Sequence, residues 1–502
     1  MAVALGASLG LAACGGEAQE PADPASAQQR IQDTVPAMSQ NVSDTLAYWG
    51  EDQNLAALQQ SLSALQSSFD ALGFAAGDDG ELIPVGPPSA LSRAMPRALP
   101  QAMGGFALAA ADDGLDADMS AEIQALAEKI FSEENFEGEG VFLVRGADVC
   151  DSGDVIDTEC AAEVDKLELR VIASVADDGL DLDFELGPNR DQPISLELRS
   201  DRVIVMVDLA ETKEAVAFLS SLSGEAAELP EVMRGVVAFS LLVNGERDVE
   251  LQVAVLEAIR FEANDVATGT PIVFTTEVRG PLYSVRMSPD EFGLSYNLGR
   301  TTLSAPLSLP DSDNVEVSGL TVDLQGLTYD MTLSAGSDTV AIRNVGLGAG
   351  TSTVKLDDTE LFAIDLNPDH GRRFDIDVSA DAAGLPLFEV SPAFDLALRY
   401  DFSAILDSSD EAAAIADDNV RITLSGDAPA VQVVEEDLAT GFAGGLRVVS
   451  GQLTLSADSA AADVVVGADE CLVELDSTDS GDGTDGTDSG DALASLSVSA
   501  CQ

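Results

Sequence analysis

Six aspartates near the end of the chain follow one another at every third position. Calcium is a hard cation that takes about 6–8 oxygen ligands, and carboxylates are among its preferred donors. In an extended conformation with three residues per turn, all six side chains would share one edge. A solvated spacer at a hairpin tip is the alternative, and low-complexity runs of like charge usually form such spacers. The loop spans 476–491, and its aspartates are Asp476, Asp479, Asp482, Asp485, Asp488 and Asp491.

Five cysteines form the second set of reactive side chains. Setting Cys14 aside, the other four allow three pairings, and the sequence separations favour Cys150 with Cys160 and Cys471 with Cys501. A disulfide that closes a loop of this size stabilises a fold by about 3 kcal/mol. Because disulfides persist in oxidising compartments, this pattern predicts a protein exported from the cytoplasm.

Cys14 follows an apolar stretch. Residues 1–13 (MAVALGASLGLAA) are small or apolar and uncharged, and Leu11-Ala12-Ala13-Cys14 resembles the lipobox of bacterial lipoprotein signal peptides. The resemblance implies that residues 1–13 are removed as a signal peptide and that Cys14 carries the fatty acyl (palmitate) anchor. A secretory signal begins with positive charge, whereas the first basic residue here is Arg30. We therefore expect the true start codon to lie upstream. Gly15, which is not aspartate, indicates the outer membrane by the sorting logic of such lipoproteins.

The overall charge excludes several classes of partner. The chain has 24 Lys+Arg against 89 Asp+Glu, a formal net charge of −65. A nucleic-acid surface needs a basic face to neutralise phosphates, so a nucleic-acid partner is excluded. Acidic residues spread along the chain indicate a surface adapted to a saline (halophilic) environment, because salt screens their mutual repulsion. Hydrophobic residues still make up 46%, which is enough for a real core.

No set of residues predicts an enzyme. The single histidine, His370, lies in Asn367-Pro368-Asp369-His370-Gly371, and proline and glycine around it indicate a turn. Metalloprotease, CxxC and P-loop motifs are missing from the sequence. We expect no catalytic residues and no cofactor, with calcium at the aspartate loop as the alternative.

Helical periodicity is confined to the first part of the chain. Residues 14–42, rich in alanine, proline and serine, predict a flexible tether. A helical region over 43–135 follows, with one helix over Ser43–Leu72, a proline-rich linker over 83–103 and a second helix over Ser120–Phe131. The leucine stripe of the first helix predicts a packing face at 3,4 spacing; its members are Leu55, Leu58, Leu62, Leu65, Phe69 and Leu72.

From about residue 140 to 502 the period changes to two. Leu180, Leu182 and Phe184 alternate with acidic residues, which is typical of antiparallel strands with one face in water. Two helices are predicted to interrupt the strands, over Lys213–Leu222 and Leu229–Leu242, and no repeat of fixed length is detectable. The fold class is mainly β (α+β): an antiparallel β-rich body, as an elongated sandwich or curled sheet. Further alternating stretches begin at Ile194, Val249, Leu320, Leu327, Phe374 and Phe394.

Three functions agree with these features. The first is an exported, lipid-anchored lipoprotein acting as a non-enzymatic structural or interaction module of the cell envelope, held at the outer membrane. The second is a periplasm-facing carrier of a lipid or other apolar ligand, because curled sheets closed by helices form apolar cavities. The third is a calcium-dependent adhesion or surface-binding protein.

Overall fold

The computed structural model is mostly β, with a large antiparallel sheet and few helices. It divides into a first unit, Met1–Leu55 with Ala102–Pro289, and a second unit, Ala56–Gln101 with Asp290–Gln502. The described residues are 20–49, 117–146, 162, 165–166, 169–176, 178–223, 229–244, 248–265, 269–278, 280–310, 315–334, 339–348, 350–357, 359–366, 373–380, 386–391, 393–401, 417–434, 445–457, 464–466, 472–475 and 495–499.

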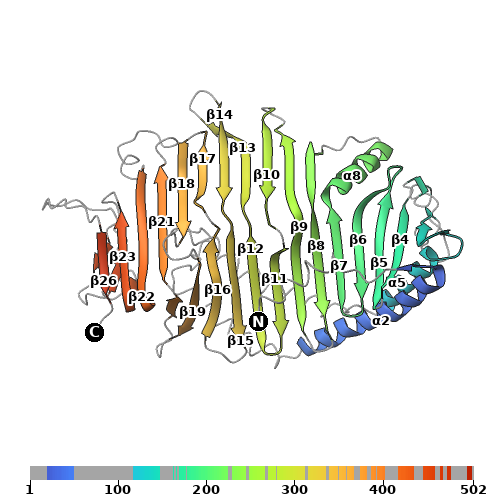
Figure 1. The fold of residues 1–502 in the computed structure, drawn as a ribbon, viewed down its shortest axis with the longest axis horizontal. Helices are drawn as coiled ribbons and strands as arrows, with labels where there is room; N and C mark the ends of the chain where they lie inside the picture. Colours follow the sequence, from blue (N-terminus) through green and yellow to red (C-terminus); the bar gives the residue numbers. More distant parts are fainter. Residues whose placement is uncertain are drawn as a thin grey trace, which may run out of the picture. The chain divides into compact units, whose positions relative to one another are not determined.

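The first unit contains an antiparallel meander in which each strand from β4 to β9 pairs with the next (Figure 1). The long β9 carries two strands on one edge, β11 along its first half and β10 along its second. The elements are β1 (Glu20–Pro21), α2 (Pro24–Trp49), α5 (Ala117–Ile130), β2 (Phe136–Gly138), β3 (Val141–Leu143), β4 (Arg170–Ala176), β5 (Gly179–Leu186), β6 (Asp191–Arg199), β7 (Arg202–Asp208), α8 (Leu209–Ser223), β8 (Val232–Val243), β9 (Val249–Asn264), β10 (Pro271–Thr276) and β11 (Gly280–Ser288).

Helix α2 begins inside the predicted tether, so the prediction of a flexible segment over 14–42 is wrong from Pro24 onward. Asp23 caps the helix, since its Oδ1 accepts a hydrogen bond from the Ser26 backbone N–H at 2.7 Å. The Ser26 hydroxyl in turn accepts from the Asp23 backbone N–H at 2.9 Å. Pro24 occupies the first helical position, where a missing N–H costs nothing. Hydrogen bonding to the Asp23 carboxylate, from the Ser26 backbone N–H first and from the Ser26 side chain second, lowers the pKa of Asp23.

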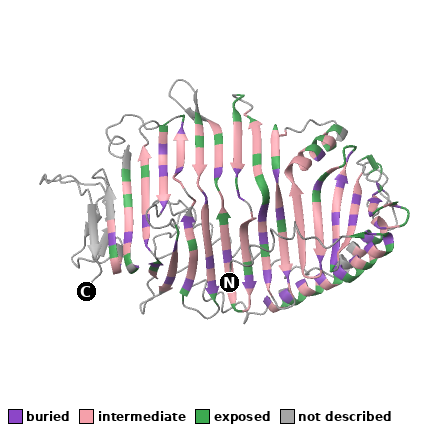
Figure 2. Ribbon diagram, viewed as in Figure 1, coloured by how far each residue is buried: buried purple, intermediate pink, exposed green. Residues whose placement is uncertain are grey.

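The buried side of α2 holds the helix together despite Pro36 in its interior. A proline removes one intrahelical hydrogen bond, so packing must supply the stability. Figure 2 shows buried positions along α2 and on the strands near it. They recur every three or four residues and form one stripe: Ala27, Ile31, Val35, Met38, Val42, Thr45 and Trp49.

The core of the first unit lies between α2, α5 and the first strands of the meander. Alternation in β5 turns Leu180 and Leu182 toward the helices, where both are buried with Phe142. Phe131, just after α5, packs edge-on against Phe142, with ring centroids 4.9 Å apart. The helix predicted over Ser120–Phe131 and the one over Lys213–Leu222 are confirmed as α5 and α8.

The segment predicted as a helix over Leu229–Leu242 is instead strand β8, so that prediction is wrong. Its apolar run, VMRGVVAFSLLV, is ambiguous by periodicity alone. Here β8 pairs with β9 along its whole length and with β7 over residues 236–242. Gly235, with φ of 118°, allows an irregularity opposite Glu257 that a side chain would obstruct.

The second unit repeats one topological step. Consecutive strands form hairpins (β13–β14, β15–β16, β17–β18, β19–β20), and each hairpin also pairs with the hairpin after next. The strands are β12 (Glu291–Leu298), β13 (Thr301–Pro310), β14 (Val315–Leu324), β15 (Leu327–Ser334), β16 (Thr339–Leu347), β17 (Ser352–Leu356), β18 (Thr359–Leu366), β19 (Arg373–Ala380), β20 (Pro386–Ser391), β21 (Phe394–Asp401), β22 (Asp417–Val434), β23 (Gly445–Ala457), β24 (Val464–Val466), β25 (Leu472–Leu475) and β26 (Ser495–Ser499).

Because each hairpin pairs with the hairpin after next, the strands form two separate runs, and both runs end at β22. Run one is β13–β14–β17–β18–β21, and run two is β12–β15–β16–β19–β20. The last strand of run one pairs with the first half of β22, and the last strand of run two with its second half. Their apolar faces share one cluster, in which Phe374 and Phe394 meet edge-on at 5.3 Å.

The connections between the runs meet at a glycine-lined seam, formed by Gly299, Gln325, Gly326, Gly348 and Gly350. The Gly348 N–H donates to the Gly326 carbonyl at 3.1 Å. A Cβ on Gly348 would lie 1.7 Å from the Gln325 carbonyl oxygen. Backbones approach here more closely than any side chain permits, so the seam requires glycine.

Candidate functional site

The most distinctive surface of the first unit is a set of apolar rows that cross its sheet. In antiparallel strands, directly opposed residues point to the same face and contact one another. The central row runs over Leu196, Val205, Phe239, Val253 and Tyr283 on β6, β7, β8, β9 and β11. The rows on either side are Ile194, Val207, Val237 and Val255, and Leu198, Val203, Leu241, Leu251 and Val285.

Helix α2 covers one end of these rows. Its Met38 and Val42 are buried with Val243, against the partly buried Val203 and Leu241. The Asn41 side-chain amide donates to the Ser200 carbonyl at 2.8 Å and holds the helix over the β6–β7 turn. The helix ends at Trp49.

Beyond this cover, three large apolar side chains are exposed in neighbouring rows: Phe239 (47% exposed), Ile194 (42%) and Leu251 (39%). We call these three residues the open patch. Phe239 lies within the central row, between Val205 and Val253, and not at an edge of the sheet. Clustered exposed apolar side chains mark binding surfaces more often than scattered ones do. At the end of the same row, burial raises the pKa of Tyr283.

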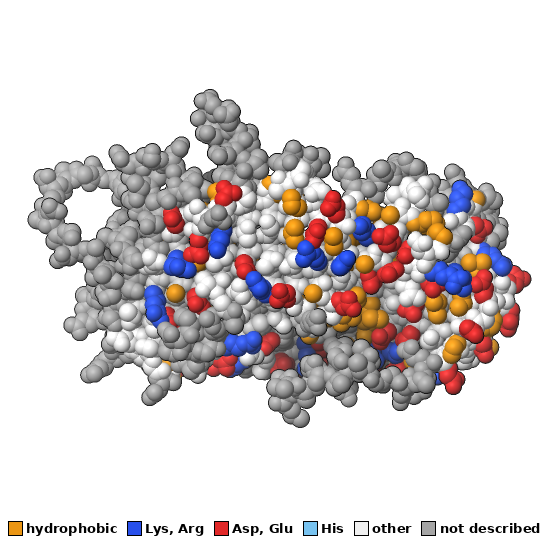
Figure 3. All heavy atoms as spheres, turned by 45° about the horizontal axis from the view of Figure 1, so that its top comes forward, with side chains coloured by type: hydrophobic (Ala, Val, Ile, Leu, Met, Phe, Trp, Pro, Cys, Tyr) orange, Lys and Arg blue, Asp and Glu red, His pale blue; other side chains and the backbone are white. Residues whose placement is uncertain are grey.

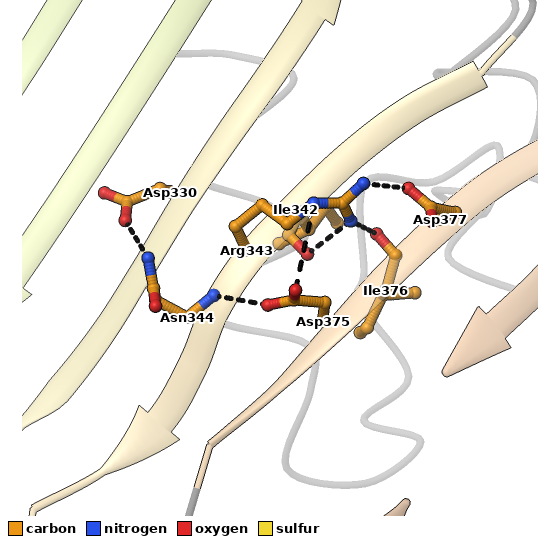
Figure 4. A network of polar contacts seen from close by, with 7 residues as sticks. All are labelled: Asp330, Ile342, Arg343, Asn344, Asp375, Ile376 and Asp377. Atoms are coloured by element: carbon orange, nitrogen blue, oxygen red, sulfur yellow. Dashed lines mark hydrogen bonds and ion pairs between the residues drawn. The ribbon is translucent and has the colours of Figure 1, made fainter. Parts of the chain in front are cut away.

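Where charged residues lie on a sheet, arginines pair with neighbouring carboxylates. In the second unit the Arg343 guanidinium lies between Asp375 and Asp377 and also donates to the Ile376 carbonyl at 3.2 Å (Figure 4). Asn344, in the left-handed region with φ of 56°, donates from its side chain to Asp330 at 2.6 Å. Its backbone N–H donates to Asp375 at 3.0 Å.

The Arg343 network ties β15, β16 and β19 together at the irregular pairing between Ile342 and Val345. Its donors are engaged by carboxylates and carbonyls, an arrangement that suits a structural role. Figure 3 shows the same pattern on a wider scale, with acidic and basic side chains adjacent to one another on the face turned forward.

The residues to which the sequence assigns a chemical role lie outside the described part of the chain. This holds for Cys14, for Cys150, Cys160, Cys471 and Cys501, for His370 and for the aspartates of 476–491. The lipid anchor, the disulfides and the calcium loop therefore stay predictions. Among the side chains that are described, no three or more His, Cys, Asp or Glu gather in a group able to hold a metal ion.

Sequence reasoning located part of the open patch and missed the rest. The alternation at Ile194 and around Leu251 predicted an apolar face, whereas Phe239 lay in the segment predicted as a helix. Within the described ranges, no helix has the length and apolar character needed to span a membrane. Comparison with protein-family models, with curated proteins and with solved structures gives no match.

Proposed function

We propose that this protein is a non-enzymatic carrier that holds an acyl chain of a lipid against the open patch. The observation that carries the proposal is Phe239, an aromatic side chain within a row of a wide sheet, with 47% of its surface exposed. Burying such a side chain is worth about 1.5–3 kcal/mol. Because about half of Phe239 is already covered, a ligand recovers about half of that free energy at Phe239 and gains more from Ile194 and Leu251.

The shape of the central row favours a linear apolar ligand. It crosses five strands, but Leu196 on the first of them packs against the core below α2. Three inter-strand spacings remain, about 14 Å at the usual separation of about 4.8 Å. That length suits an extended fatty acyl chain. A stable protein partner would need roughly 800 Å² on each side, much more than three exposed side chains provide.

The sequence supports placing this carrier in the cell envelope. The lipobox-like segment implies a lipid anchor at Cys14, and we propose that the anchor holds the folded chain at the outer membrane. The proposal includes the curled sheet predicted from the sequence, because a curled apolar face encloses more of an acyl chain than a flat one.

A fluorescent fatty acid tests the proposal directly. The full chain with Cys14→Ser, which carries no lipid of its own, is titrated with dansyl-undecanoic acid at 1 M NaCl. We expect saturable binding that Phe239→Asp weakens at least tenfold, a loss of about 1.4 kcal/mol or more. Val449→Asp is the matched control, since Val449 is 43% exposed on β23, in the other unit.

The outcomes separate clearly. Binding that only Phe239→Asp weakens supports an acyl-chain site at the open patch. Two results contradict the proposal and favour the structural or interaction module instead. One is equal binding by the Cys14→Ser chain with and without Phe239→Asp or Val449→Asp. The other is no binding to the Cys14→Ser chain.

A further inference from the structure

A hollow of about 320 Å³ lies beside the start of α8 in the first unit. It is independent of the open patch, because Ser195 and Met206 alternate along their strands with the residues of the apolar rows and so point to the other face. Its lining combines a guanidinium, an amide, a hydroxyl, two carboxylates and two apolar groups: Arg190, Gln192, Ser195, Met206, Asp208, Glu211 and Val236.

The two carboxylates are fixed in place by the start of the helix. Asp208 Oδ1 accepts hydrogen bonds from the backbone N–H groups of Ala210 (2.8 Å) and Glu211 (3.1 Å). Glu211 Oε2 accepts from the backbone N–H of Gln192 at 3.2 Å. The first N–H groups of α8 are therefore capped by the protein itself, and the helix terminus is not an anion site.

Arg190 supplies the opposite charge and is held on a constrained turn. Its N–H donates to the Gly187 carbonyl at 3.1 Å, and its φ of 61° is uncommon for a residue with a side chain. The turn is pinned to α8, because a Cβ on Gly187 would lie 3.0 Å from the Phe218 ring. No carboxylate of the described residues pairs with the Arg190 guanidinium, although two line the same hollow.

Separated charges across one hollow select a ligand that carries both signs. A simple anion would be repelled by Asp208 and Glu211, whereas a simple cation would leave the Arg190 guanidinium without a counter-charge. We propose that this hollow binds a small zwitterion, with its carboxylate at Arg190, Gln192 and Ser195 and its ammonium group at Asp208 and Glu211. Met206 and Val236 supply the apolar wall that its carbon atoms contact.

Isothermal titration at constant ionic strength tests this proposal with four probes. L-alanine and glycine betaine are zwitterions with and without ammonium N–H groups, whereas acetate carries only the anion and tetramethylammonium only the cation. We expect saturable binding of at least one zwitterion, at least tenfold tighter than either single-charge probe. The tighter zwitterion shows whether the site uses ammonium N–H donors.

Two variants that each remove one charge test which residue binds each end of the zwitterion. Arg190→Gln and Glu211→Gln should each weaken zwitterion binding at least fivefold, while Arg286→Gln, at an exposed arginine of β11, should leave it unchanged. Unchanged far-UV circular dichroism confirms that the variants fold, and Phe239→Asp should bind the zwitterion normally. Absence of saturable binding up to 0.1 M, equal binding of acetate, or full binding by both variants overturns the proposal.

Discussion

Asp395 illustrates how this protein uses its scarce basic residues. Its side chain is completely buried, and it accepts two hydrogen bonds from the half-exposed Arg421 guanidinium, one of them at 2.8 Å, and one from the Thr423 hydroxyl at 3.2 Å. A buried carboxylate is tolerated only when it is paired in this way. The pair joins β21 to β22, where run one meets the long strand.

Asp395→Asn should therefore lower the free energy of unfolding by about 2 kcal/mol, because it replaces a charged acceptor by an amide that presents N–H groups to a guanidinium. Urea unfolding at pH 7 measures the change. Arg399→Gln is the control: its pair with Glu360 is 56% and 33% exposed, and such pairs contribute less than about 1 kcal/mol. Equal losses in both variants would contradict the role assigned to burial.

Glu197 shows the opposite situation on β6. Desolvation raises its pKa, and the nearby Asp181 carboxylate adds to the effect, which outweighs attraction by Arg199 and Arg202. A carboxyl with a raised pKa binds more protons when folded, so its contribution to stability falls as the pH rises from its ordinary pKa through the folded value.

Glu197→Gln should consequently be more stable than the wild type at pH 7, and this advantage should disappear below about pH 4, where both states are protonated. Thermal unfolding from pH 4 to 8 measures the difference. Glu257→Gln, at an exposed position of β9, should follow the wild-type curve. A stability advantage of Glu197→Gln over the wild type that grows as the pH falls from 7 to 4 would refute this assignment.

At the scale of elements, the sequence predicts well where strands lie. It predicts poorly which elements pair with them or pack against them. The alternation around Leu180, Leu320 and Phe374 places β5, β14 and β19 correctly, because period two is a local property. Phe239 was missed because the apolar run of β8 fits either element, and only pairing with β7 and β9 decides it. The start of α2, Asp23-Pro24-Ala25-Ser26, was readable as an N-cap with proline at the next position, but composition suggested a tether.

The interleaved hairpins could not be recognised in the sequence, because the hairpins differ in length and only their pairing pattern repeats. The sequence accordingly lacks a fixed period, although the connections that contain Gly299, Gly326 and Gly348 return the chain to the same seam. What the sequence does retain is glycine at the crossing points, Gly326, Gly348 and Gly350.

Gly348→Ala should destabilise the second unit by about 2–3 kcal/mol, because its Cβ would overlap the Gln325 carbonyl and force the two connections apart. Gly319→Ala is the matched control, since its Cβ would meet only Asp357 Oδ1 at an ordinary 3.5 Å. Urea midpoints of the two variants compare them. A Gly348→Ala protein as stable as Gly319→Ala would mean that the connections do not cross closely.

At the scale of the whole molecule, charge dominates. Of 89 acidic residues, at most 24 could be neutralised by lysine and arginine one to one. The described ion pairs already engage many of the arginines, so the remaining carboxylates repel one another within each unit. Those arginines are Arg170, Arg199, Arg260, Arg300, Arg343, Arg399 and Arg421.

Raising NaCl from 0.05 to 1 M should therefore increase the melting temperature by about 10 °C or more at pH 7, as the Debye length falls from more than 10 Å to about 3 Å. Salt also strengthens apolar burial, and pH separates the two causes. Near pH 4 many carboxylates are protonated, so repulsion is weaker and the increase should shrink to less than half. An increase of equal size at pH 4 and pH 7 would show that salt acts on the apolar core and not on the acidic surface.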